Sequence, residues 1–403
     1  METIVRKKIL VIPSWYPTEE RPLEGTFFQE QALAMSELYD IRILYPEKAT
    51  KNRFVRLLNT LKYILRIRPR IEFINITFTK EPKLYSFTIV GSLGILWFYE
   101  KVMTWEYNAA IEKVIKSGWK PDLIHAQSVV YGGIYSYFIA LKHKIPYIIT
   151  EHNVFLLSDY SIKVQRLIKS SLEHAKLVLA VSQHQQRMIL MHGIKCKTQV
   201  IGNMIDEHKF YIAPPHHQAF TILFITYNGF IKDNETFLRA IKLFKQKSIH
   251  PFVVNVLGRT FENGISDYFI SLVKDYDLSD CVELTGSVDR TQIVNYFQTS
   301  NVFVSTSIAE TFGVSLCEAL FCGVPIISTA NGGVDDMIDK KNGVLVNIQD
   351  ADAICEALIK ISNKEIVFDP VDVRNTVIDK FGKKEFIKKM DFFYSSAMNE
   401  VVD

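Results

Sequence analysis

The sequence of 403 residues contains only five cysteines, and none of them forms a CxxC pair. This scarcity excludes a disulfide framework and CxxC-based zinc sites, and it indicates reduced, mostly buried thiols in a reducing compartment. The longest apolar run, Phe87–Tyr99, is too short to span a bilayer and contains two glycines. The amino-terminal residues show no secretory signal, so we expect a cytoplasmic protein.

Internal repeats, low-complexity tracts, GxGxxG and nucleic-acid-binding signatures are also missing, so no nucleic-acid partner is expected. What is present is the composition of a globular chain, with 48% hydrophobic and 23% charged residues. The charge is uneven. Residues 1–210 contain 29 Lys and Arg against 19 Asp and Glu, whereas the remainder contains 18 against 25. A basic first half predicts an anionic partner or surface.

Short apolar segments alternate with helical patterns, which is typical of parallel sheets covered by helices on both faces. A proline- and histidine-rich stretch at 210–220 is the best linker candidate. We therefore predict an α/β chain of two doubly wound, Rossmann-like domains facing a central cleft. They span 1–210 and 211–382, and a final helix at about 383–403 packs back on the first. The expected strands are Lys8–Pro13, Ile41–Tyr45, Phe73–Thr77, Asp122–Ala126, Pro146–Thr150, Leu177–Val181 and Gln199–Ile201, then Thr221–Thr226, Phe252–Leu257, Val282–Thr285, Val302–Thr306, Val324–Ser328 and Gly343–Val346.

The stretch ETFGVSLCE at 310–318 places two carboxylates in an apolar region. Gly313 is expected to begin a helix, whose first amides and dipole form an anion site. Glu310 precedes that site and Glu318 follows it, which suits a ligand with a central diphosphate and hydroxyl-rich groups at each end. The alternative is that Glu310 caps the helix and Glu318 only forms a salt bridge.

One region closely resembles the E-x7-E signature of retaining glycosyltransferases of the GT-B fold, family 4 (glycosyl transferases group 1). It consists of ETFGVSLCEALFCGVPIIST, followed by NGGVDDMI and NGVLVN. VELTGSVDRTQIVNYFQTSNVFVSTS at 282–307 and VIGNMIDEHKF at 200–210 resemble further segments of that family. The resemblance spans most of residues 8–390 and is weakest at 45–120, where acceptor-binding segments vary.

The resemblance implies roles position by position. Glu318 would bind the ribose of a nucleotide sugar and Glu310 the transferred sugar. Lys232 would bind the diphosphate, and a histidine at 152 would face the reacting centre. The other donor-binding residues implied are Gly25, Ser287, Val288, Phe312, Gly313, Val314, Ser315 and Leu316.

The family usually adds an arginine about five residues before the lysine, but this chain has Tyr227 there. Arg259 is one candidate to supply the missing positive charge. The alternative is that Arg259 is only a surface loop residue. Like His152, His125 lies near the end of an expected strand. A single histidine at such a position often has only a structural role.

The resemblance also implies the chemistry, in which a donor phosphate oxygen takes the acceptor's proton on the same face of the sugar. No cofactor is expected. Asp350 and Asp352 form a DxD pattern that binds metal in some glycosyltransferases. Because they begin an expected helix, we predict a helix cap and a metal-independent enzyme.

The stretch KNRFVRLLNTLKYILRIRPR at 51–70 is rich in Lys and Arg and has no acidic residue. Its apolar residues recur at helical spacing, which predicts an amphipathic helix for an anionic membrane surface. The alternative is a helix that packs on its own domain and keeps a solvated basic face.

The leading interpretation is a retaining glycosyltransferase for cell-surface polysaccharide synthesis. It would move a hexose-type sugar from a nucleotide-diphosphate sugar to a glycan or a lipid-linked acceptor, as a cytoplasmic enzyme peripheral to the inner membrane face. The alternatives are a GT-B relative with other chemistry, such as an epimerase or a phosphorylase, and a non-catalytic glycan- or nucleotide-binding protein. A phosphorylase would need a pyridoxal-binding lysine and a longer chain.

Overall fold

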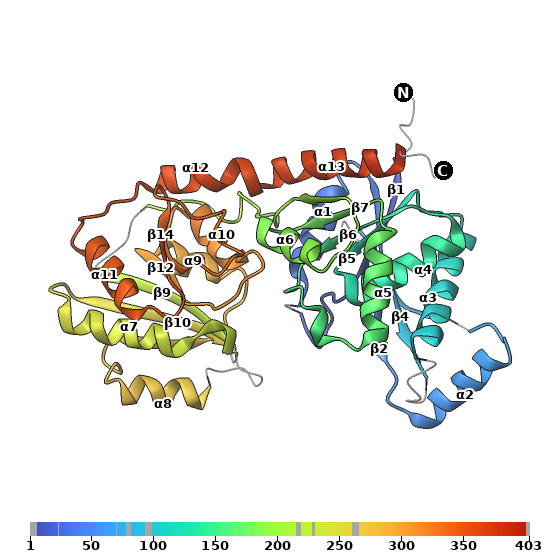
Figure 1. Ribbon diagram of the computed structural model, residues 1–403, viewed down its shortest axis with the longest axis horizontal. Helices are drawn as coiled ribbons and strands as arrows, with labels where there is room; N and C mark the ends of the chain where they lie inside the picture. The colour runs from blue at the N-terminus through green and yellow to red at the C-terminus, as the bar shows by residue number, and fades with distance from the viewer. Residues whose placement is uncertain are drawn as a thin grey trace. The chain divides into compact units, whose positions relative to one another are not determined.

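The computed structural model describes residues 6–22, 24–69, 71–77, 82–92, 99–214, 219–227, 230–259 and 266–399, without the side chains of 74–77, 99, 227 and 259. The chain divides into two compact units (Figure 1). Unit 1 comprises Met1–Val181, Gln186–Ile201 and Ile387–Asp403, and unit 2 comprises Ser182–Gln185 and Gly202–Phe386. The division falls after Ile201 rather than after residue 210. Residues 202–210 join unit 2 because the guanidinium of Arg374 donates to the carbonyls of Glu207 and Phe210.

Unit 1 is built on a sheet with the strand order β3-β4-β2-β1-β5-β6-β7-β8. All neighbouring strands are parallel except β3 and β4, which are antiparallel. The strands are β1 (Lys8–Pro13), β2 (Asp40–Ala49), β3 (Phe73–Thr77), β4 (Lys83–Ile89), β5 (Leu123–Gln127), β6 (Tyr147–Glu151), β7 (Leu177–Ala180) and β8 (Thr198–Val200).

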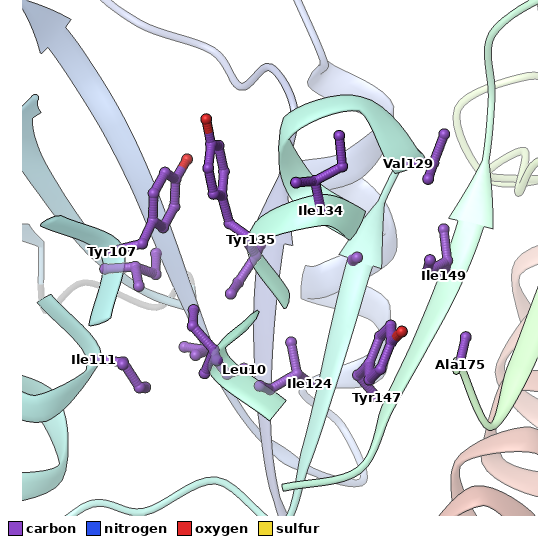
Figure 2. Close-up of a cluster of buried hydrophobic side chains, with 14 of the residues drawn as sticks. Leu10, Tyr107, Ile111, Ile124, Val129, Ile134, Tyr135, Tyr147, Ile149 and Ala175 are labelled. Carbon is purple, nitrogen blue, oxygen red and sulfur yellow. The ribbon is translucent and has the colours of Figure 1, made fainter. Parts of the chain in front are cut away.

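Helices of unit 1 follow most of its strands and bury an apolar core against the sheet. Figure 2 shows part of that core, in which the rings of Tyr107 and Tyr135 lie side by side and Ile124 lies near Tyr147. The helices are α1 (Thr26–Met35), α2 (Arg53–Ile64), α3 (Tyr99–Lys116), α4 (Ile134–His143), α5 (Ile162–Glu173) and α6 (Gln183–Met191), of which α6 begins in unit 2.

Unit 2 is built on a fully parallel sheet with the strand order β11-β10-β9-β12-β13-β14. These strands are β9 (Phe220–Tyr227), β10 (Phe252–Arg259), β11 (Val282–Gly286), β12 (Val302–Ser305), β13 (Ile326–Thr329) and β14 (Gly343–Val346). The stacked rings of Phe224 and Phe237, 3.8 Å apart, fix α7 onto β9 in its core.

The remaining helices are α7 (Asn234–Lys247), α8 (Asp267–Asp275), α9 (Ile293–Gln298), α10 (Val314–Phe321), α11 (Ala351–Ser362), α12 (Pro370–Phe381) and α13 (Lys383–Asn399). Helix α13 begins in unit 2 and ends in unit 1. There Tyr394 bonds His125 at 2.7 Å, and Tyr39 donates to Asp391 at 2.6 Å.

The two doubly wound sheets match the predicted fold class, with one strand missed. Segment Lys83–Ile89 forms β4, although the sequence suggested only that an apolar run begins at Phe87. The antiparallel pair β3–β4 corrects the expectation of purely parallel sheets. All five cysteines are free thiols. Within the described ranges, no helix is both long enough and apolar enough to cross a bilayer.

Candidate active site

Each sheet has a point where its strand order reverses, and ligands of doubly wound folds bind outside the carboxyl ends of the strands at such points. In unit 2 this point lies between β9 and β12. The loop after β9 contains Lys232, and the loop after β12 contains Glu310. The loops touch, since the amide of Ile308 donates to the carbonyl of Ile231 at 2.7 Å.

Lys232 and Glu310, predicted to act on the donor, form an ion pair. Nζ of Lys232 lies 2.6 Å from Oε1 of Glu310, and both side chains are largely buried. The hydroxyl of Ser307 donates to the same carboxylate oxygen at 2.9 Å. Glu310 does not cap α10, because its side chain turns to these partners and Gly313 occupies the cap position. That alternative is therefore wrong for Glu310.

Gly313 begins α10 with a φ of +78°, in the left-handed region that favours glycine. A Cβ at this position would also lie 2.8 Å from Cγ1 of Val334. No side chain of the cap residue covers the first turn of the helix. The neighbouring residues implied in donor binding divide by burial: Phe312 and Leu316 are buried, whereas Val314 and Ser315 are half-buried. The latter two therefore keep access to a ligand at the helix start.

Gly332 and Gly333, to which the sequence analysis assigned no role, pack against the backbone of Glu310. The backbone of Glu310 pairs with Gly332, and a Cβ on Gly333 would lie 2.2 Å from the carbonyl oxygen of Glu310. Only glycine allows this approach. The NGG pattern at 331–333 was a usable signal, because consecutive glycines after a buried strand indicate close backbone packing.

Glu318 lies in α10 and is only 5% exposed. Its Oε1 lies 2.8 Å from Nη2 of Arg290, in the loop after β11. The salt bridge that the sequence analysis kept as an alternative is thus present. The same loop contains the exposed Ser287 and the half-buried Val288, implied to line the base pocket. Arg290 was missed, because its partner lies 28 residues away in the sequence.

The side chains of Tyr227 and of Arg259, the expected replacement for the family arginine, lie outside the described residues. Among the described residues, Lys232 pairs with Glu310 and Arg290 pairs with Glu318.

In unit 1 the predicted residues surround the carboxyl ends of β1, β5 and β6. His152 is buried and bonds Oε1 of Gln127 through Nε2 at 2.8 Å. The ring of Phe28 meets it edge-on at 4.8 Å. Gly25 precedes α1 with a φ of +72°, and a Cβ there would lie 3.0 Å from the Trp15 ring. Gly25 therefore permits a tight aromatic cluster beside His152.

The other titratable groups of this edge are structural. Glu151 accepts hydrogen bonds from the amides of Val129, His152 and Asn153, and burial raises its pKa. His125 is locked between Tyr394 and Thr150, and burial lowers its pKa to about 3, so it stays neutral.

The DxD pattern lies at a helix start. The carboxylate of Asp350 accepts from the amide of Ala353 at 2.9 Å and caps α11. In the part of the chain that the structure describes, no cluster of three or more His, Cys, Asp or Glu could hold a metal ion. Metal independence remains a prediction.

Two family models match adjacent parts of the chain. The model of "Glycosyl transferases group 1" matches residues 206–378, and that of "Glycosyltransferase Family 4" matches 54–209. The TuaC glycosyltransferase of Bacillus subtilis (strain 168), assigned to teichuronic acid biosynthesis, is 23% identical over 97% of this chain and 98% of its own. Alpha-monoglucosyldiacylglycerol synthase of Streptococcus pneumoniae is 25% identical over 75% of this chain and 74% of its own.

The fold also matches solved structures. The Anabaena protein HepE in complex with UDP-glucose superposes with a TM-score of 0.68 at 16% identity, over 96% of this chain and 99% of HepE. At this identity the likeness establishes the GT-B fold alone.

Proposed function

With glycosyltransferase domains matched over 54–378 and a GT-B fold, this chain is a glycosyltransferase, and we propose that it is a retaining enzyme that uses a nucleotide-diphosphate hexose. The observation that carries the proposal is the Lys232–Glu310 pair beside the start of α10, at the reversal point of the second sheet. A cation, a carboxylate and free helix amides at one point suit a sugar diphosphate.

In the proposed complex the diphosphate lies against the amides near Gly313 and the ammonium of Lys232. Glu310 then accepts hydrogen bonds from hydroxyls of the transferred sugar, and Glu318 from the ribose. Arg290 holds Glu318 in place before the donor arrives. The pairing fixes the position of the buried carboxylate that accepts the hydroxyl donors.

The reaction breaks the bond between the anomeric carbon and the diphosphate oxygen, which keeps the electron pair. Lys232 and the helix amides stabilise the charge that develops there. The acceptor hydroxyl oxygen bonds to the anomeric carbon on the same face, and its proton passes to the leaving phosphate oxygen. No protein nucleophile is required. Each glutamate has its own cation, which distinguishes the pair from the adjacent carboxylates of a retaining glycosidase.

For the acceptor side, we propose a glycan or lipid-linked acceptor of cell-surface polysaccharide synthesis at a membrane surface. Two relatives support this class, since their names refer to teichuronic acid biosynthesis and to a glucosyl-diacylglycerol. Helix α2 adds a structural reason. It follows the carboxyl end of β2 and therefore lies at the same edge as His152.

Helix α2 turns its apolar side outward. Only Asn59 and Thr60 of the helix are buried, whereas the six apolar residues at 54, 57, 58, 61, 64 and 65 are between 40% and 68% exposed. The helix does pack on its own domain, as the alternative expected, because Asn59 donates to Glu106 and the ring of Tyr63 meets Trp105 of α3. That packing does not bury the six apolar residues. The residues 51–70 combine this apolar face with Lys and Arg and no acid, which suits an anionic bilayer. The proposed location is the inner face of the cytoplasmic membrane.

A thermal-shift screen with a panel of nucleotide sugars, followed by donor hydrolysis without acceptor, tests the enzyme assignment. We expect one donor to raise Tm and to release nucleoside diphosphate slowly, with and without EDTA. Glu310→Ala should abolish release, whereas Glu283→Ala, an exposed glutamate of β11, should not. Tight binding without release would instead support a non-catalytic nucleotide-binding protein, and conversion of the sugar without release would support an epimerase.

A further inference from the structure

The reversal point of the first sheet lies between β1 and β5, in the same topological position as the Lys232–Glu310 site of the second. The loop after β1 begins at Ser14, and the loop after β5 is the segment Val129–Gly133 (η1). By the same rule this crevice is a ligand site. None of the residues predicted from the sequence lies in η1.

The backbone of this segment is strained. Ser128 has φ 66° and ψ 145°, and Tyr131 has φ 70° and ψ −74°. Side-chain-bearing residues rarely adopt either conformation, and the second is that of a strained three-residue turn. Glycine would adopt both at little cost, and the chain already has glycines at 132 and 133. Strain of this kind persists where the surrounding structure imposes it, and it concentrates at ligand sites.

The loop after β1 and strand β6 impose the conformation. From the loop after β1, the Ser14 hydroxyl lies 2.8 Å from the carbonyl of Gln127 and 3.1 Å from that of Ser128, and it accepts the amide of Gly132 at 3.1 Å. From β6, the carboxylate of Glu151 accepts the amide of Val129 at 2.7 Å. A Cβ on Gly132 would lie 2.6 Å from the carbonyl of Ile12, so the segment is pressed onto β1.

The strained residue presents an aromatic ring at the edge of the sheet. Tyr131 is 49% exposed, and its ring is stacked on Tyr135 at 6.5 Å with an angle of 20° between the planes. Tyr135 is stacked in turn on the buried Tyr107 at 4.3 Å and 17°, and Figure 2 shows these two rings side by side. A ring supported by two others loses little conformational freedom when it binds a flat apolar ligand face.

We propose that Tyr131 is the stacking platform for a pyranose ring of the acceptor. This inference rests on the proposed function and narrows it, since the acceptor would end in a sugar rather than in a bare lipid phosphate or a simple alcohol. The C–H face of the pyranose packs on the aromatic ring, and its hydroxyls remain at the rim of the ring for polar partners. Tyr131 is then a specificity-determining residue.

Saturation-transfer NMR tests the contact with p-nitrophenyl pyranosides of glucose, galactose and N-acetylglucosamine as probes. The wild-type chain should transfer magnetisation to ring C–H protons of at least one pyranoside. Tyr131→Ala and Tyr131→Gly should lose at least nine-tenths of that signal, while Tyr131→Phe keeps it. Tyr268→Ala, at an exposed tyrosine of unit 2, is the control variant and should keep it.

Thermal stability separates this role from a structural one. Tyr131→Gly should raise Tm, because it removes the strain. A lowered Tm with an unchanged pyranoside signal would overturn the proposal, as would the absence of ring contacts in the wild type. Donor hydrolysis by the wild type tests the transferase assignment independently, so loss of one result does not imply loss of the other.

Discussion

Nζ of Lys232 lies 2.6 Å from Oε1 of Glu310, so the cation and the carboxylate assigned to the donor neutralise one another across two loops. The pair keeps both charges ordered at the reversal point of the second sheet. In the proposed complex, the diphosphate would compete with Glu310 for the ammonium, and the sugar hydroxyls would compete with the ammonium for Glu310.

Because the two side chains act together, their removal should not be additive. Lys232→Ala and Glu310→Ala should each lower donor turnover by about 10²-fold or more, as expected when one electrostatic contact to a transition state is lost. The double variant should be only slightly slower than either single one, which corresponds to a coupling of roughly 2–3 kcal/mol. Steady-state kinetics of the four proteins measures the cycle. Strictly multiplicative losses would show that the pair does not act as a unit.

Arg290→Ala should destabilise unit 2, because it leaves the buried carboxylate of Glu318 without its cation. Breaking one side of a buried pair typically costs about 3 kcal/mol or more. Urea unfolding measures the cost, and Glu318→Gln should cost less, since it removes the charge. Both variants should weaken nucleotide binding in calorimetry. Arg374→Lys, in the same unit and away from the site, should leave binding unchanged even where stability falls.

Membrane binding should depend on the exposed leucines of α2. A Leu58→Asp, Leu61→Asp variant should lose at least tenfold in co-sedimentation with anionic liposomes, because each leucine contributes roughly 1.5–3 kcal/mol when buried. Its Tm should change little, since both side chains are already exposed. The matched control is Leu141→Asp, at an exposed leucine of α4. Equal recovery of all three proteins in the supernatant at low salt would contradict the membrane assignment.

Glu106 should make stability fall with rising pH. Burial raises the pKa of its carboxyl to about 7, although the amides of Val90 and Gly91 and the side chain of Asn59 lower it. The folded chain therefore retains a proton that the unfolded chain releases near pH 4.5. The retained proton stabilises the folded state, and this stabilisation is fully present below pH 4.5. It amounts to roughly 3 kcal/mol of unfolding free energy, which is lost as the pH rises to about 7.

Denaturant unfolding at several pH values tests this assignment against Glu106→Gln. The stability difference between wild type and variant should shrink steadily between pH 5 and pH 7.5. Parallel curves would show that Glu106 is ionised in the folded state across that range.

The sheets could be predicted because their strands are buried on both faces and read as short apolar runs. Strands β1, β3 and β14 have the predicted bounds. Strand β4 was missed because Lys83–Ile89 alternates polar and apolar residues and merges with the apolar run that follows. Its neighbour β3 pairs with it in the antiparallel sense, which periodicity does not reveal.

The candidate site could also be predicted only in part. The glycine that begins α10 and the two glutamates lie close together in the sequence, so their pattern indicated a donor site. The pairings are not local: Glu318 meets Arg290, and Glu310 meets Lys232 some 78 residues earlier. The strain at Tyr131 arises from contacts with Ser14 of the loop after β1 and Glu151 of β6, and only the folded sheet brings these together.

Helix α13 completes unit 1. Tyr394 bonds His125, and Asp391 accepts the hydroxyl of Tyr39, so residues synthesised 269 and 352 residues later supply part of this core. During translation, these polar groups of unit 1 cannot be paired until unit 2 has also been synthesised. A fragment ending near residue 210 would leave His125 and Tyr39 uncovered, whereas circular permutation that places α13 before β1 would let unit 1 pair them early.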